Sequence, residues 1–118
     1  PDLKVIVSPS SVGIVAAAQA VKDQGKIGKV YVTGLGLPSE MAGAIKSGAS
    51  KSFAIWNPID LGYAATYLAD DLVKGTATKT EASMGKLGKV KLDAEGNGAM
   101  AKPFVYDASN IDKFSKIF

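Results

Sequence analysis

The sequence contains no cysteine, no histidine and no arginine, although 14 of its 118 residues are lysine. Thiol catalysis, cysteine–histidine metal sites and imidazole-based acid–base chemistry are therefore excluded. The lack of cysteine is compatible with an oxidising and with a reducing compartment. No apolar run approaches the roughly 20 residues that a membrane-spanning helix needs.

The charge is modest and evenly spread. The formal net charge is only +3, and the lysines alternate with acidic residues from Lys4 to Lys116. Proteins that read nucleic acids usually cluster their basic residues and rely on arginine, so we expect no nucleic-acid partner. The adjacent carboxylates Asp70 and Asp71 are expected on the solvent side of a helix, where they would do no acid–base work.

The first half of the chain alternates between strand and helix patterns. With 47% hydrophobic residues, the chain can form a core. The expected elements are strands over Leu3–Val7, Lys29–Thr33 and Ser52–Ile55, and helices over Val12–Val21 and from Pro38 to about Lys46. Such alternation indicates a parallel sheet with right-handed crossovers. The sequence thus predicts the α/β class, with a parallel three-layer αβα sheet.

The longest helix is expected from Pro58 to about Lys74. Proline suits the first helical position, and Asn57 before it is a favoured N-cap. The parallel alternation then stops: 76–88 has the composition of a loop, and short strands are expected over 89–92 and 104–106. Ser109 with Asp112 resembles a capping box that would open a final short helix.

The ends of the three expected strands carry the residues best suited to bind a ligand. Carboxyl ends of parallel strands share one edge of a sheet, which is where α/β proteins usually place their ligands. Here that edge would present hydroxyls, backbone N–H groups, an amide and one aromatic ring, which suits a small polyhydroxylated ligand. The candidate residues are Pro9, Ser10, Ser11, Leu37, Trp56 and Asn57. A core position for Trp56, with the serines acting only as helix caps, fits the residues equally well.

Two shorter motifs favour other functions only weakly. Gly34-Leu-Gly36 follows a strand as in a dinucleotide-binding turn, but Ser39 stands where the third glycine is required. Ser83 and Lys86 have the Ser-x-x-Lys spacing of some acyl-transfer enzymes, yet they lie in a polar loop without the accompanying motifs. Neither motif predicts an enzyme.

Three segments together resemble a known family. Ser-Pro-Ser-Ser after the first strand, Val-Thr-Gly-Leu-Gly-Leu-Pro-Ser-Glu-Met, and Phe-Ala-Ile-Trp-Asn-Pro-Ile-Asp-Leu-Gly are similar to the C-terminal part of type I periplasmic sugar-binding proteins. The similarity is strongest to the rhamnose-binding and autoinducer-2-binding branch, and it extends to the tail from Asp107 to Phe114.

The resemblance implies a two-lobe protein of which this chain is a C-terminal fragment. Residues 1–57 would belong to the second lobe, the helix and loop of 58–88 to the first lobe, and 89–118 would supply the C-terminal strands and short helix. Ligand contacts would come from the Pro9-Ser10-Ser11 turn, largely through backbone, and from Trp56-Asn57. Ribose-type relatives have an aspartate where this chain has Gly36-Leu37, so the resemblance does not fix the identity of the sugar.

The implied function is that of a non-enzymatic solute-binding component of an ABC importer. Its partners would be a rhamnose-like sugar or autoinducer-2 and a membrane permease, with no cofactor or metal. It would act in the periplasm or as a lipid-anchored protein on the extracellular face. The alternatives are the effector domain of a LacI-type repressor and, less favoured, a nucleotide-binding enzyme domain.

Fragmentation has two expected consequences. The chain would carry only about half of the ligand-binding groups, so we expect it to bind sugar weakly or not at all. The apolar stripe of the helix from Pro58 to Lys74 would need a new partner, either the three-stranded sheet or a second copy in a homodimer formed by element exchange.

Overall fold

The computed structural model describes residues 2–118, which divide into two compact units. Unit 1 contains the residues up to Ile55 together with Phe104–Phe118, and unit 2 contains Trp56–Pro103. The chain therefore passes between the units twice, once after Ile55 and once after Pro103.

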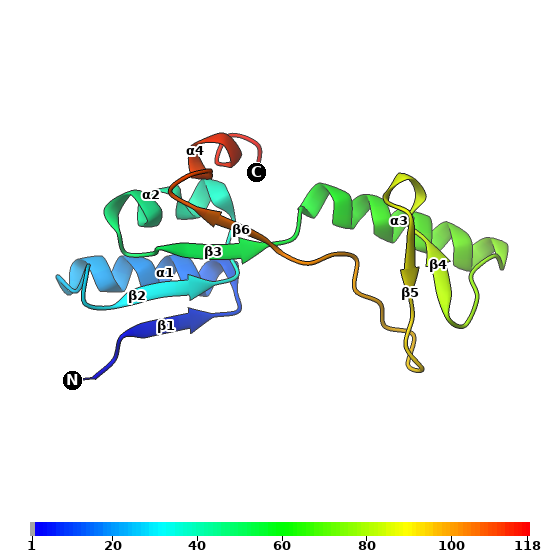
Figure 1. The fold of residues 1–118 in the computed structure, drawn as a ribbon, viewed down its shortest axis with the longest axis horizontal. Helices are drawn as coiled ribbons and strands as arrows, with labels where there is room; N and C mark the ends of the chain where they lie inside the picture. Colours follow the sequence, from blue (N-terminus) through cyan, green and yellow to red (C-terminus); the bar gives the residue numbers. More distant parts are fainter. Residues whose placement is uncertain (1) are drawn as a thin grey trace. The chain divides into compact units, whose positions relative to one another are not determined.

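Unit 1 is built on four short strands, shown in Figure 1. Strands β1 and β2 are parallel, and Val5 lies opposite Tyr31. A single parallel bridge between Leu35 and Ala54 continues the arrangement from β2 to β3, and β6 pairs with β3 in the antiparallel sense. The strands are β1 (Val5–Ser8), β2 (Tyr31–Gly34), β3 (Ser52–Ile55) and β6 (Phe104–Asp107).

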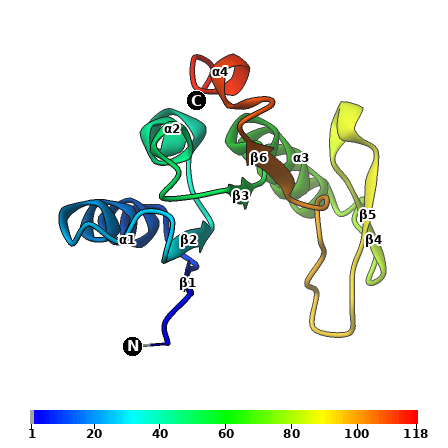
Figure 2. The same ribbon diagram turned by 60° about the vertical axis from the view of Figure 1, so that its left-hand side comes forward.

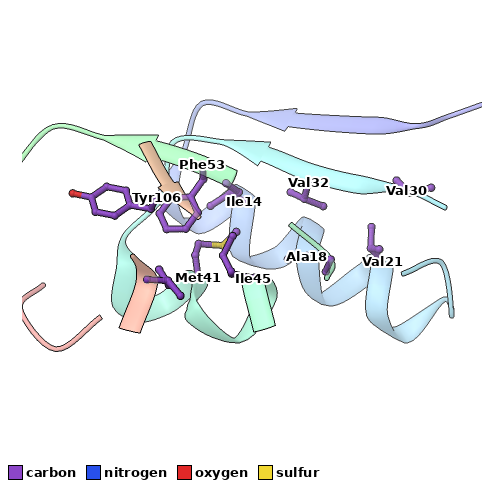
Figure 3. Close-up of a cluster of buried hydrophobic side chains, with 11 residues drawn as sticks. Ile14, Ala18, Val21, Val30, Val32, Met41, Ile45, Phe53 and Tyr106 are labelled. Carbon is purple, nitrogen blue, oxygen red and sulfur yellow. The ribbon is translucent and has the colours of Figure 1, made fainter. Parts of the chain in front are cut away.

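The helices of unit 1 bury their apolar side chains in one common core. Figure 2 shows α1 and α2 on the same side of the strands, and Figure 3 shows their side chains meeting those of β2 and β3. Ile14, Val32 and Met41 in this core are fully buried. The helices are α1 (Ser11–Asp23), α2 (Pro38–Ser47) and the short α4 (Ile111–Phe114).

The opposite side of the same strands is open. Val5 and Val7 on β1 are 48% and 68% exposed, and Val105 on β6 is 54% exposed. Of the three layers that the sequence predicts, unit 1 thus contains the sheet and one helical layer.

Unit 2 consists of one long helix and an antiparallel hairpin (Figure 1). The buried Ala64 of α3 packs with Ala82, Met84 and Val90 of the hairpin in a small second core. The carboxylate of Asp71 accepts the Ser83 N–H at 2.6 Å, which fastens the helix to the hairpin. The elements are α3 (Pro58–Lys74), β4 (Glu81–Ser83), the 3-10 turn η1 (Gly85–Leu87) and β5 (Lys89–Lys91).

The expected bounds of β3 and α3 agree with the structure, whereas β1 and β2 begin two residues later than predicted and end one residue later. Strand β4 and the turn η1 occupy part of 76–88, which the sequence predicts as a loop. The apolar residues of this segment are too few, and too often interrupted by glycine, to show the periodicity of a strand or a helix.

Two local predictions are wrong. Asp71 does not project into solvent like a surface carboxylate but binds the hairpin. The capping box of Ser109 and Asp112 does not form, because the Ser109 hydroxyl and N–H both donate to Asp107 and the N-cap of α4 is Asn110. Asp112 instead forms an ion pair with Lys46 of α2, at 2.7 Å.

Candidate functional site

The first part of the candidate site is the turn from β1 to α1, which contains Pro9, Ser10 and Ser11. The Ser10 hydroxyl accepts the Gly13 N–H at 3.4 Å and so caps α1, as the sequence predicts. The Ser10 carbonyl receives both the Ser8 hydroxyl, at 3.2 Å, and the Ile14 N–H, at 2.9 Å. The Ser11 hydroxyl has no hydrogen-bond partner within residues 2–118. In this turn Ser11 therefore offers the more available hydroxyl.

The second part is the turn from β2 to α2, which lies beside the first because β1 and β2 are parallel neighbours. The Leu35 N–H donates to the Ser8 carbonyl at 2.9 Å, which joins the two turns directly. Leu37 is half-buried and stands at the N-cap of α2, where its side chain cannot accept a hydrogen bond. Pro38 follows at the first helical position and is buried.

The packing of unit 1 requires glycine at the first position of the Gly34-Leu-Gly36 motif and leaves little space for a side chain at the second. Gly34 has φ of +132°, and a β-carbon there would lie 1.9 Å from the Ser8 carbonyl oxygen. A β-carbon on the buried Gly36 would meet Met41 at 3.0 Å and Ile14 at 3.1 Å. Close packing thus accounts for the motif without a bound phosphate.

Trp56 and Asn57 directly follow β3 but belong to unit 2. Trp56 is 37% exposed, so its ring is neither fully buried nor free in solvent. Its indole N–H donates to the Ala101 carbonyl at 2.6 Å. The ring lines a hollow of about 230 Å³ together with Leu61 and the segment from Gly98 to Ala101.

The side chain of Asn57 caps α3. Its amide oxygen accepts the N–H groups of Ile59, at 2.9 Å, and Asp60, at 3.4 Å. Its amide nitrogen donates to the Asp60 carboxylate at 2.9 Å. The predicted capping role is therefore confirmed, and the oxygen of Asn57 is already engaged by the helix.

The structure thus brings four of the six candidates together in unit 1, at the carboxyl ends of β1 and β2. The other two, Trp56 and Asn57, are the first two residues of unit 2 and directly follow β3. All six are uncharged, so recognition at these residues would rest on hydrogen bonds and on the face of the indole ring. The four in unit 1 are Pro9, Ser10, Ser11 and Leu37.

The sequence did not indicate Ala101, whose backbone carbonyl accepts the hydrogen bond from the only indole in the chain. No side-chain pattern could have indicated it, because any residue offers the same carbonyl. Ser8 belongs to the predicted Ser-Pro-Ser-Ser turn, but the hydrogen bond by which its carbonyl joins the two turns was not predicted. The positive φ at Gly34 is the one indirect signal for it.

No helix within residues 2–118 is long and apolar enough to cross a membrane. The same described residues contain no group of three or more acidic side chains that could hold a metal ion.

Comparison with known proteins identifies the family. Residues 1–77 match the family model described as a periplasmic binding protein domain. The chain therefore belongs to the periplasmic binding protein family, and the family expected from its motifs is confirmed.

Solved structures agree with this assignment. A sugar ABC transporter protein from Actinomyces odontolyticus is 39% identical, with a TM-score of 0.75, and the match covers 97% of this chain and 38% of that one. An ABC transporter solute-binding protein from Clostridium phytofermentas with bound L-rhamnose is 38% identical, with a TM-score of 0.83 and coverages of 100% and 41%.

A third structure, LsrB from Clostridium saccharobutylicum in complex with AI-2, is 18% identical with a TM-score of 0.78, and the match covers 96% of this chain and 40% of that one. At this identity the likeness shows the fold alone. The fold is thus the α/β fold of type I periplasmic binding proteins, and the chain spans about two fifths of the length of these relatives.

Proposed function

We propose that this chain is part of the solute-binding component of an ABC importer and that its ligand is a rhamnose-like sugar or a sugar-like signal such as autoinducer-2. The observation that carries the proposal is the edge formed by the first two turns, with Trp56 one bond beyond the end of β3. The rhamnose-bound relative at 38% identity supports a deoxysugar as the ligand. The protein would have no catalytic activity, because the candidate residues contain no nucleophile with an adjacent base.

Polar and apolar candidate residues would contact different parts of the sugar. Backbone groups of the Pro9–Ser11 turn and the free hydroxyl of Ser11 would hydrogen-bond the sugar hydroxyls. The exposed part of the Trp56 ring and the side chain of Leu37 would cover an apolar face of the sugar. Because Asn57 caps α3 through its oxygen and donates one amide N–H to Asp60, it would have only its second amide N–H to offer.

The two compact units support an assignment to two lobes. Unit 1 would belong to the second lobe and α3 with the following loop to the first lobe, so the chain would cross between lobes next to Asn57. Ligand binding would then close the lobes over the sugar by bending at the crossings. In this role the protein would work outside the cytoplasmic membrane and hand its ligand to a membrane permease.

Isothermal titration calorimetry with L-rhamnose tests the ligand. We expect binding by a full two-lobe protein that contains this chain, and weak or undetectable binding by the 118-residue chain. In the two-lobe protein, Trp56→Ala and Ser11→Ala should each weaken binding about tenfold or more. Tyr67→Ala removes an exposed aromatic ring of α3 outside the candidate site and serves as the control. Unchanged affinity in both site variants would contradict the proposed site.

We further propose that the isolated chain forms a homodimer by exchanging elements. One side of α3 carries apolar side chains that are 53% to 87% exposed, namely Ile59, Leu61, Leu72 and Val73. Leaving such surface in water costs about 25 cal/mol per Å², which favours its burial against a second copy. Light scattering should give twice the monomer mass of 12.2 kDa, and a strictly monomeric mass would contradict this proposal.

A further inference from the structure

The two chain connections between the units are held together at both of their ends. On the side of unit 1, Ile55 and Phe104 are the last paired residues of the antiparallel β3–β6 ladder. Both connections therefore leave unit 1 from one hydrogen-bonded pair of strands.

On the side of unit 2, Trp56 and Ala101 are joined by the 2.6 Å hydrogen bond from the indole to the carbonyl. Trp56 is the first residue of the unit, and only Lys102 and Pro103 separate Ala101 from its exit. Directly beyond the end of the β3–β6 ladder, a hydrogen bond from a side chain to the backbone thus holds the two connections together.

The segment that carries Ala101 is itself fixed within unit 2. Gly98 lies so close to β5 that a β-carbon there would meet Val90 at 2.6 Å and the Lys91 carbonyl oxygen at 2.9 Å. Met100 packs against the small core of this unit. The Ala101 carbonyl therefore has a defined position relative to the hairpin, and the indole binds an ordered acceptor.

We propose that the hydrogen bond from Trp56 to Ala101 acts as a clamp. It holds the two connections together, so that they bend as a single hinge. Between the Ile55–Phe104 pair and the Trp56–Ala101 hydrogen bond, the first connection contains a single peptide bond and the second contains Lys102 and Pro103. Proline restricts its own φ and the conformation of the residue before it, so the longer connection is also stiff. Bending at the crossings is then confined to motions that keep Trp56 and Ala101 together.

This inference assigns Trp56 a positioning role that is separate from any contact with sugar. It rests on the proposed function only in that the connections serve as the hinge of a closing protein. The aromatic ring would be held at the crossing by its N–H, so its exposed face would keep one orientation during closure.

The clamp can be tested in the ligand-free 118-residue chain, which separates it from the question of sugar binding. Trp56 is the only tryptophan, so its indole N–H gives a single resonance in a nitrogen–proton NMR spectrum. We expect this proton to exchange with solvent about fivefold more slowly than an exposed indole, as one net hydrogen bond implies. Exchange at the rate of a free indole would overturn the clamp without any variant.

The variant Trp56→Phe keeps an aromatic ring and removes the donor. Backbone order parameters for residues 100–102 should fall from values near 0.85, typical of rigid backbone, toward 0.6 or below, while those of β3 and α3 stay unchanged. Tyr63→Phe is the matched control, because it removes the acceptor of the Lys86 N–H, another bond within unit 2 and away from the connections. Unchanged order parameters in Trp56→Phe, or an equal fall in Tyr63→Phe, would overturn the proposal.

Discussion

The rings of Phe53 and Tyr106 stack across β3 and β6 with their centroids 5.4 Å apart and their planes inclined by 21°. The two residues are opposite each other in the antiparallel ladder, and each is only 2% exposed. The last strand is therefore held in unit 1 by aromatic packing as well as by backbone hydrogen bonds.

Replacing Tyr106 by alanine should strongly destabilise unit 1. The substitution leaves a cavity beside Phe53 and should lower the free energy of unfolding by about 3–5 kcal/mol. Tyr106→Phe keeps the ring. The Tyr106 hydroxyl makes no hydrogen bond within residues 2–118, and no buried polar atom there lacks a partner, so this hydroxyl reaches solvent and its loss should change stability by less than about 0.5 kcal/mol. Urea unfolding followed by circular dichroism measures both, and similar losses in the two variants would contradict the packing argument.

Gly34→Ala should be among the most damaging changes near the candidate site. The new methyl group would collide with the Ser8 carbonyl, and the positive φ is unfavourable for alanine, so a loss of at least about 3 kcal/mol is expected. Gly43→Ala is the control, since a β-carbon at this position within α2 meets nothing within 4 Å. The control should gain about 1 kcal/mol from helix propensity, and thermal unfolding would show opposite shifts.

Acid should loosen the contact between α3 and the hairpin. The Ser83 N–H and, secondarily, the Thr76 hydroxyl hold the pKa of Asp71 below its ordinary value, because both stabilise the carboxylate. A lowered folded-state pKa stabilises the fold above the unfolded pKa of about 3.9, and this contribution is lost as the pH falls through the folded-state value. Urea unfolding followed by Trp56 fluorescence measures the stability of unit 2, which should be lower at pH 3 than at pH 7.

Asp71→Asn should remove part of this pH dependence, since the amide cannot carry the charge. The control is Asp70→Asn, which removes an exposed carboxylate paired with Lys74 at 2.8 Å and should have little effect on stability. Equal pH profiles for the unaltered chain and Asp71→Asn would show that the Ser83 contact does not depend on the carboxylate charge.

Loss of the cap of α3 should be measurable in unit 2. Asn57→Ala removes the acceptor of the Ile59 and Asp60 N–H groups and should cost about 1 kcal/mol. Asn57→Asp restores a good cap acceptor but brings a second carboxylate beside Asp60, so it should recover only part of the loss. A cost below the error of urea unfolding for Asn57→Ala would contradict the capping role.

The features that the sequence predicted well are those with local causes. Pro58 and Asn57 define the start of α3, and Gly75 with φ of +67° ends it, so its bounds follow from neighbouring residues alone. The turns after β1 and β2 were predictable for the same reason: Ser10 caps α1, and Pro38 occupies the first position of α2.

The features that it missed have distant causes. The hairpin strand β4 contains the weak pattern Glu-Ala-Ser and depends on Asp71 for the Ser83 contact, 12 residues away along the chain. The indole of Trp56 meets a carbonyl 45 residues later, which no periodicity encodes. The exposure of Val5 and Val7 on β1 likewise could not be predicted, because a run of β-branched residues is also typical of a strand that is buried on both faces.

The pairing of β6 with β3 joins two strands that are separated in the sequence by the whole of unit 2. Strand β3 can pair with β6 only when the chain between them forms a loop that contains all of unit 2. Closing such a long loop costs chain entropy. Once unit 2 has folded, the Trp56–Ala101 bond brings the two ends of that loop close together. The small helix–hairpin unit would then act as an internal nucleus, shortening the effective loop so that Phe104–Asp107 docks beside β3 as a late step of folding.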